Sequence, residues 1–278
     1  MLQKLVEVAD INMNRVRVEF SNLWKKIGHH LSSYGQNRNK RIAEYSVDSL
    51  RQLAKKFLEK QELANFHFQK DFLEPFRTIM LGSYTNEGLQ DIRFFILTCM
   101  CQFAQQKIKS IKSGWEIILD IFKLAAGDEN EDLYQESLRT MRFILQKQNF
   151  EVIEEYFNKI MDCLFKYVEN RKFIEEAYPA FELLEIMGDE LATNKNLKFP
   201  VKSKEKYEEY EREQWKTLLL SLAKRSFDER EGIAQHSHKL LFEILQKHSS
   251  RIHENLWEVI FHELLRAIFD DLNVSIET

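Results

Sequence analysis

The histidines, cysteines and acidic residues are the side chains of this sequence that could bind a metal ion or act in catalysis. His29 and His30 are adjacent, and His236 and His238 stand two positions apart. Helical side chains share one face at spacings of three or four residues, so neither pair is placed to hold one ion. The abundant carboxylates fit solvated helix faces. We therefore expect no metal site.

The cysteines Cys99, Cys101 and Cys163 all lie in apolar helical patterns, without the spacing of a zinc site. They are interpreted as buried, reduced thiols of a cytosolic protein. The sequence also lacks glycine-rich phosphate loops, a G-x-S-x-G nucleophile elbow and an H-E-x-x-H zinc motif. We expect no catalytic residue and no cofactor, which disfavours an independent enzyme.

A group of polar residues near the start of the chain is better suited to binding a partner. In "NMNRVRVEF", Asn12 and Asn14 can cap the following helix, and Arg15 and Arg17 fall on different faces of it. One of these arginines either pairs with an acidic residue of a neighbouring helix, such as Asp48, or contacts a partner. Both interpretations stay open at this point.

Composition indicates which elements must position these side chains. Of the 278 residues, 44% are hydrophobic and 30% charged, which is typical of a folded protein. Only 8 glycines and 3 prolines are present, and such scarcity favours long helices. The net charge of −4 argues against a nucleic-acid partner. No secretory signal is recognisable, and no apolar run approaches the ~18 residues of a membrane span.

Three tryptophans mark an internal repeat. Trp24, Trp115 and Trp215 are each expected to begin an amphipathic helix, followed by a short polar turn and a second helix. A serine stands 22 residues after each tryptophan, at Ser46, Ser137 and Ser237. A small side chain at a fixed place predicts close packing of the two helices, with a solvated surface serine as the alternative.

The spacing between these tryptophans predicts the architecture. The intervals are 91 and 100 residues, each about two units of the ~40–47 residues typical of HEAT or armadillo repeats. Unmarked pairs are expected at Gln69–Gln106 and Phe150–Gly188, and Trp257 follows Trp215 by one unit. The prediction is an all-α, HEAT/armadillo-like α-solenoid of about five to six helical pairs. Residues 1–278 would form a single helical-repeat domain, a piece of a longer protein.

One segment, Thr193–Lys206, is predicted to be an exposed linker. It is rich in lysine, contains Pro200 and has few apolar residues. The alternative is a basic patch for phosphate or lipid headgroups.

The stretch "NFHFQKDFLEPF", residues 65–76, is unusually rich in phenylalanine. Phe68, Phe72 and Phe76 are spaced by four and would share a buried helix face. Pro75 is tolerated only early in a helix, so we expect the helix to begin between Gln69 and Phe72. The polar residues at that start, Gln69, Lys70 and Asp71, would then be exposed.

Several stretches resemble one known family. "NMNRVRVEFSNLW", "VDSLRQLAKKFLEKQELANFHFQKDFLEPF" and "EGIAQHSHKLLFEILQKHS" resemble the large Arf guanine-nucleotide exchange factors, the brefeldin A-inhibited proteins of the trans-Golgi. The resembling segment is the first helical homology region downstream of the catalytic exchange domain. Because the exchange glutamate belongs to that separate domain, the resemblance implies a regulatory region without catalysis.

The resemblance also implies partners. These are a GTP-loaded small GTPase of the Arf family and other domains of the parent exchange factor, with roles in autoinhibition and in recruitment to the Golgi membrane. The expected location is the cytoplasm, peripherally on the trans-Golgi membrane through partners. The alternative function is a structural spacer or dimerisation scaffold that orients the catalytic domain. The candidate partner-binding residues, polar positions within the resembling motifs, are Asn12, Asn14, Arg15, Arg17, Asp48, Arg51, Asn65, Gln69, Lys70 and Asp71.

Overall fold

The computed structural model describes residues 2–15, 17–60, 68–146, 150–193, 204–252 and 254–266. Over these residues the chain is all-α, as predicted, with twelve α-helices and without strands. Their bounds are α1 Leu2–Asn12, α2 Arg17–Gly35, α3 Lys40–Phe57, α4 Phe68–Ser83, α5 Gln90–Gln106, α6 Trp115–Ala126, α7 Glu131–Gln146, α8 Phe150–Glu169, α9 Tyr178–Thr193, α10 Lys204–Arg225, α11 Glu231–His248 and α12 Glu254–Val259.

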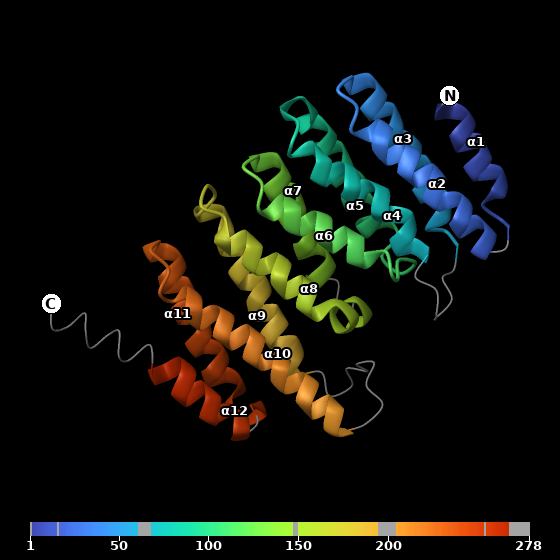
Figure 1. Cartoon of the computed structure of the whole chain (residues 1–278). Helices are drawn as coiled ribbons and strands as arrows, with labels where there is room; N and C mark the ends of the chain where they lie inside the picture. Colours follow the sequence, from blue (N-terminus) through green and yellow to red (C-terminus); the bar gives the residue numbers. More distant parts are fainter. Residues whose placement is uncertain are drawn as a thin grey trace. The chain divides into compact units, whose positions relative to one another are not determined.

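The chain divides into two compact units, Met1–Gln148 and Asn149–Thr278. In the first unit α2 pairs with α3, α4 with α5 and α6 with α7 (Figure 1). Helix α4 also packs against both α2 and α6, and α5 packs against both α3 and α7. Stacked pairs therefore form two layers, and α1 covers α2 and α3 at one end.

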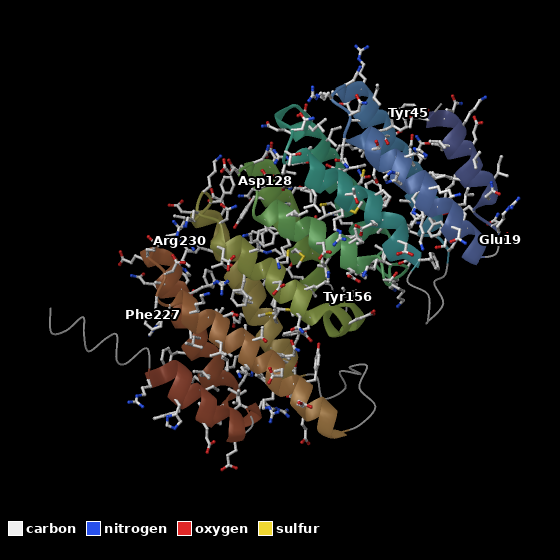
Figure 2. The ribbon with its side chains drawn as sticks, viewed as in Figure 1. Glu19, Tyr45, Asp128, Tyr156, Phe227 and Arg230 are labelled. Atoms are coloured by element: carbon white, nitrogen blue, oxygen red, sulfur yellow. The ribbon has the colours of Figure 1, made fainter. Side chains whose placement is uncertain are left out.

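The second unit repeats this arrangement. Helices α8 and α9 form one pair and α10 and α11 the next, with α10 packed on α8 and α11 on α9. Helix α8 is kinked at Tyr156, whose φ of −118° and ψ of 21° are not helical (Figure 2). After α12 the chain continues as a π-helical turn, Ile260–Leu265. The prediction that both units belong to one domain stays a prediction.

The turn inside each helical pair has the same local geometry. In all five described turns an Asn or Asp side chain accepts a hydrogen bond from the backbone N–H two residues later, at distances of 2.9–3.2 Å. Such Asx turns reverse the chain in few residues. The acceptor residues are Asn37, Asn86, Asp128, Asn170 and Asp228. This recurrence is structural support for the repeat.

The three repeat serines are buried, as close packing of the paired helices predicts. Ser46, Ser137 and Ser237 are each 0% exposed. The Ser46 hydroxyl donates to the carbonyl of Leu31 across the α2–α3 contact at 2.7 Å. The alternative of a solvated surface serine is therefore excluded at these positions.

The tryptophan positions are only partly as predicted. Trp115 begins α6, but Trp24 and Trp215 lie well inside α2 and α10, so the prediction that each tryptophan begins a helix is wrong for these two. Helix α2 extends further toward the amino terminus because its buried stripe already includes Phe20, and α10 does so because mostly charged residues continue the helix before Trp215. The two unmarked pairs are present as α4–α5 and α8–α9.

Two boundary predictions need correction. Helix α4 begins at Phe68, one residue before the predicted interval. The predicted linker is shorter than expected, because Thr193 still belongs to α9 and α10 begins at Lys204. Residues 194–203, including Pro200, lie outside the described residues, so the two interpretations of the lysine-rich segment stay predictions.

Candidate binding site

Five aromatic rings from three helices form a cluster in the first unit. They are Phe20 and Trp24 of α2, Phe57 of α3, and Phe68 and Phe72 of α4. Phe72 lies at the centre, with its ring centroid 3.8 Å from that of Trp24 and 4.0 Å from that of Phe57. Stacked aromatic pairs of this kind add stability beyond their buried area.

A proline inside α4 explains how Trp24 is held. Pro75 has no backbone N–H, so the carbonyl of Asp71, four residues earlier, loses its helical donor. The indole N–H of Trp24 donates to that carbonyl oxygen at 3.1 Å. Gly28, one turn further along α2, lets the helices approach, since a Cβ atom there would stand 3.1 Å from Cγ of Pro75. The proline is therefore accommodated by the neighbouring helix.

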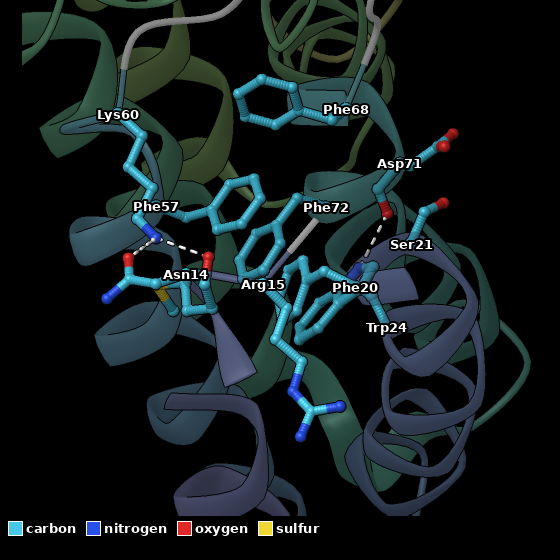
Figure 3. A pocket seen from close by; sticks show the side chains of 11 residues that line it. Asn14, Arg15, Phe20, Ser21, Trp24, Phe57, Lys60, Phe68, Asp71 and Phe72 are labelled. Atoms are coloured by element: carbon cyan, nitrogen blue, oxygen red, sulfur yellow. Dashed lines mark hydrogen bonds between the residues drawn. The ribbon is translucent and has the colours of Figure 1, made fainter. Parts of the chain in front are cut away.

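The rings wall a cavity of about 240 Å³ that opens to the surface (Figure 3). Phe20, Trp24, Phe57 and Phe72 are at most 5% exposed, so the inner walls are apolar. Five polar side chains stand around the opening: Asn14, Arg15, Ser21, Lys60 and Asp71. The cavity has the composition of a binding pocket, with apolar walls and a few polar groups at the edge.

Opposite charges occupy opposite ends of the opening. Lys60 and Asn14 lie at one end of the row of rings, and Asp71 and Ser21 at the other (Figure 3). The Lys60 Nζ donates to the Met13 carbonyl at 2.6 Å and to Asn14 Oδ1 at 2.7 Å, both neutral oxygens. Partial burial lowers the pKa of Lys60, and Asp10 opposes this effect. The lysine charge is thus only partly compensated.

Arg15 and Asp71 complete the charge distribution. Both are exposed, and neither side chain forms an ion pair with another residue in the part of the chain that the structure describes. The structure therefore brings three predicted residues, Asn14, Arg15 and Asp71, to one opening. The predicted cap at Asn12 is wrong, because this residue ends α1 and its amide nitrogen donates to the Val8 carbonyl at 2.7 Å.

Gln69 and Lys70 have structural partners. Gln69 is 0% exposed, so the prediction that it is exposed at the start of its helix is wrong. Its side chain donates to the Ser110 carbonyl at 3.0 Å and accepts from the Lys112 N–H at 2.7 Å, holding the turn before α6. Lys70 forms an ion pair with Glu116 at 2.7 Å. Both contacts tie α4 to the next pair.

The remaining candidates lie elsewhere. Asp48 and Arg51 pair with each other on α3, at 2.6 Å, and Gln52 also donates to Asp48. The arginine that pairs with Asp48 is therefore Arg51, and Arg15, one of the two arginines considered for this role, does not pair with it. Arg17 is the first residue of α2, and nothing is described for its side chain. Asn65 falls outside the described residues.

Sequence reasoning missed the other residues of the opening. Phe57 and Trp24 carry the same helical periodicity as core residues, and no spacing separates a pocket wall from a core contact. Lys60 and Ser21 belong to no recognisable motif. The candidates Asn14, Arg15 and Asp71 and the density of aromatic residues in residues 65–76 do point to this region, but helical spacing predicts the aromatic side chains as core. Phe72 and Phe76 are indeed buried, whereas Phe68 is half-buried at the pocket wall.

The described residues show little reactive chemistry. Cys99, Cys101 and Cys163 are free and buried, as predicted, and burial raises the pKa of Cys99 and of Cys101 to about 12. Thiols held so far from ionisation are poor nucleophiles. Over the described residues, no group of three His, Cys, Asp or Glu side chains is placed to hold a metal ion. None of the described helices combines the length and apolar character of a membrane span.

Comparison with known proteins places this helical region in a family. Residues 56–143 match the family described as "Mon2/Sec7/BIG1-like, HDS". The chain is 38% identical to human brefeldin A-inhibited guanine nucleotide-exchange protein 1 over 186 residues, which are 66% of this chain and 10% of that protein. It is 32% identical to protein 3 of the same name from Arabidopsis thaliana over 295 residues, covering 99% of this chain and 17% of that protein.

These matches define a helical region of the Mon2/Sec7/BIG1-like type. The chain is homologous to the brefeldin A-inhibited guanine nucleotide-exchange proteins, and the family resemblance predicted from the sequence is confirmed. It spans 10–17% of the length of the curated relatives that it matches.

Proposed function

We propose that this chain is a non-catalytic regulatory region of a large Arf guanine nucleotide-exchange factor. It binds GTP-loaded Arf, neighbouring domains of its parent protein, or both. The homology to exchange proteins over nearly the whole chain supports this proposal. The observation that carries the binding role is the aromatic pocket, whose opening collects three residues of the family-like motifs, Asn14, Arg15 and Asp71.

The stacked pairs support a second part of the proposal, that the repeats belong to the HEAT or armadillo class. Each pair has an Asx turn of the same geometry, and within each unit a helix packs against the equivalent helix of the next pair. Repeats of this class offer extended surfaces to partner proteins. Binding to Arf at the trans-Golgi would recruit the parent protein peripherally, and binding to its own domains would hold it inactive.

A liposome co-sedimentation experiment tests the Arf part. The 278-residue chain is mixed with liposomes that carry Arf loaded with either a non-hydrolysable GTP analogue or GDP. We expect retention with the GTP form, reduced by Arg15→Glu and unchanged by Arg139→Glu. Arg139 lies on α7 outside the pocket, is 71% exposed at its side chain and pairs with Glu136 of the same helix, and it serves as the matched control for charge reversal. Equal retention with both nucleotides, or none, would contradict Arf recognition.

An exchange assay tests the absence of catalysis. The chain alone should leave the rate of GDP release from Arf unchanged, since catalysis is assigned to a separate domain. Accelerated release would overturn the regulatory assignment.

A spacer or dimerisation scaffold is the second candidate function. Tyr45 of α3 points outward and is 47% exposed (Figure 2), and Phe94 of α5, which packs beside α3, is 43% exposed. Exposed aromatic side chains on adjacent helices are typical of contact surfaces. Sedimentation velocity would show a concentration-dependent dimer that Tyr45→Ser with Phe94→Ser abolishes. A monomer at all concentrations would exclude the dimerisation scaffold.

A further inference from the structure

The aromatic pocket is continuous with a shallow surface furrow between α2 and α4. A second depression, of about 250 Å³, shares Trp24 and Asp71 with the pocket and extends to His29 and Thr78. The pocket thus forms one end of an elongated surface. An elongated furrow with a single deep end fits a polypeptide segment better than a compact small molecule.

The size of the pocket limits what enters it. An apolar cavity of about 150 Å³ is large enough for benzene, and pockets for drug-sized ligands start near 300 Å³. At about 240 Å³, the cavity between the rings fits one large apolar side chain. A leucine, phenylalanine or tryptophan would lie against the stacked rings of Phe57, Phe72 and Trp24.

The charged residues at the opening indicate on which side of the apolar anchor an acidic group of the bound segment would lie. The hydrogen-bond acceptors of the Lys60 ammonium group are neutral oxygens, and Asp10 compensates its charge only in part. Arg15 is exposed without an ion pair to a described residue. A carboxylate placed near them would be attracted to both. Asp71 stands at the other end of the opening and would repel a carboxylate there. The opening is therefore complementary to an acidic group on one side of the apolar anchor only.

We propose that the α2–α4 furrow binds a protein segment that inserts one large apolar side chain among the aromatic rings and sets a neighbouring carboxylate against Arg15 and Lys60. This inference rests on the proposed role in protein binding and names the chemistry of the segment that is recognised. The segment carries an acidic residue within one helical turn of its apolar anchor. The same carboxylate on the opposite side of the anchor would meet Asp71, and the furrow beyond it is lined by both Lys25 and Glu74, so no net positive charge favours an acidic group there.

Selection from a displayed library of random dodecapeptides tests this proposal with the intact 278-residue chain. Enriched peptides should share one large apolar residue with Asp or Glu nearby on a constant side. The affinity of a synthetic enriched peptide should fall about tenfold, or about 1.4 kcal/mol, for Arg15→Glu, because the change removes an attractive charge and adds a repulsive one. Arg139→Glu, the matched control, should leave the affinity unchanged.

A second variant keeps the test independent of charge. Ser21 is half-buried at the opening, so Ser21→Phe should place a ring in the pocket with little effect on the core. It should abolish peptide binding while the circular dichroism spectrum stays unchanged. The proposal would be overturned if basic peptides were enriched, if no peptide were enriched, or if the peptides bound the Ser21→Phe variant as well as the natural chain.

Two further outcomes separate this inference from the wider function. The selection contains no GTPase and no membrane, so a failed Arf experiment with a successful selection would refute Arf recognition alone. The chain can also be tested for binding to vesicles of phosphatidylcholine and phosphatidylserine. If it binds them, if Arg15→Glu and Ser21→Phe both abolish this binding, and if no peptide is enriched, the pocket binds lipid and the proposed peptide anchor is overturned.

Discussion

The hydrogen bond from Trp24 to the Asp71 carbonyl can be isolated by a double-mutant cycle with Pro75. Trp24→Phe removes the indole N–H that donates to this carbonyl at 3.1 Å. With Pro75 present, no helical N–H replaces it. In Pro75→Ala, the new alanine N–H can donate to the same carbonyl, as in an uninterrupted helix. The cost of losing the indole should therefore depend on the residue at position 75.

The expected magnitude follows from the burial of the bond. An acceptor left without a partner costs about 1–3 kcal/mol, and this carbonyl is only partly buried, so we take the lower end, about 1 kcal/mol. Loss of ring contact with Phe72 adds to the cost of Trp24→Phe in both backgrounds and cancels in the cycle. Trp24→Phe should thus destabilise the Pro75→Ala chain by about 1 kcal/mol less than the natural chain.

Urea denaturation followed by circular dichroism measures the four stabilities. Trp115→Phe is the matched control, since the Trp115 indole nitrogen is buried and forms no hydrogen bond within the described structure. Its cost should be the same with proline or alanine at position 75. If Trp24→Phe costs equally in both backgrounds, the indole does not compensate the proline, and the reasoning about how α2 and α4 are joined is refuted.

Three further perturbations test other parts of the structure. Asp128→Asn keeps the side-chain oxygen that accepts in the Asx turn but removes the carboxylate charge 3.0 Å from the buried Arg93 guanidinium. The free energy of unfolding, measured by urea denaturation, should fall by about 3–5 kcal/mol. An unchanged stability would show that Asp128 does not stabilise the buried Arg93 charge. Gln69→Leu should cost about 2 kcal/mol in the same assay because two backbone groups lose their partner. A loss of stability as small as that for an exposed glutamine would show that the Gln69 side chain does not hold the turn before α6. Cys99 and Cys101, with pKa raised from 9.0 to about 12, should resist iodoacetamide in the native chain. Their contribution to stability should be full below pH 9 and fall as the pH rises toward 12, because only the unfolded thiols ionise in that interval. Mass spectrometry measures the labelling of the two thiols, and urea denaturation at several pH values measures the stability. A stability that rises between pH 9 and pH 12 would contradict the expected direction.

Periodicity predicts much of this fold because each helix buries one stripe. Val47, Leu50, Leu53 and Phe57 recur at the spacing of one helix face, and all are at most 5% exposed. Periodicity cannot define where a helix begins, because the first turn requires no apolar residue. Trp24 and Trp215 therefore mark the core contact of their helices rather than the first residue.

The polar residues were harder to assign for a physical reason. Glutamine is polar, and sequence patterns place it on the surface unless a partner is known. Gln69 is fully buried because two backbone groups of the turn before α6, at Ser110 and Lys112, lie within hydrogen-bond distance of its amide. That turn stands about forty residues away in sequence, and its position depends on the stacking of pairs. Only the packed structure brings donor and acceptor together.

The repeat itself helps to locate the candidate site, because one of its copies departs from the others. Trp24, Trp115 and Trp215 share one repeat position, yet the indole nitrogens of the latter two are buried without a hydrogen bond to any described residue. Trp24 alone among them donates to a neighbouring helix, because Pro75 frees the Asp71 carbonyl there. A proline inside a helix weakens it, and stability alone gives no reason for one at this position. The departure coincides with the aromatic pocket, since Trp24 and Asp71 both line it. The copy that breaks the structural pattern is thus the one at which we propose a binding surface. This coincidence is the reason to test Pro75 and Trp24 for partner binding as well as for stability.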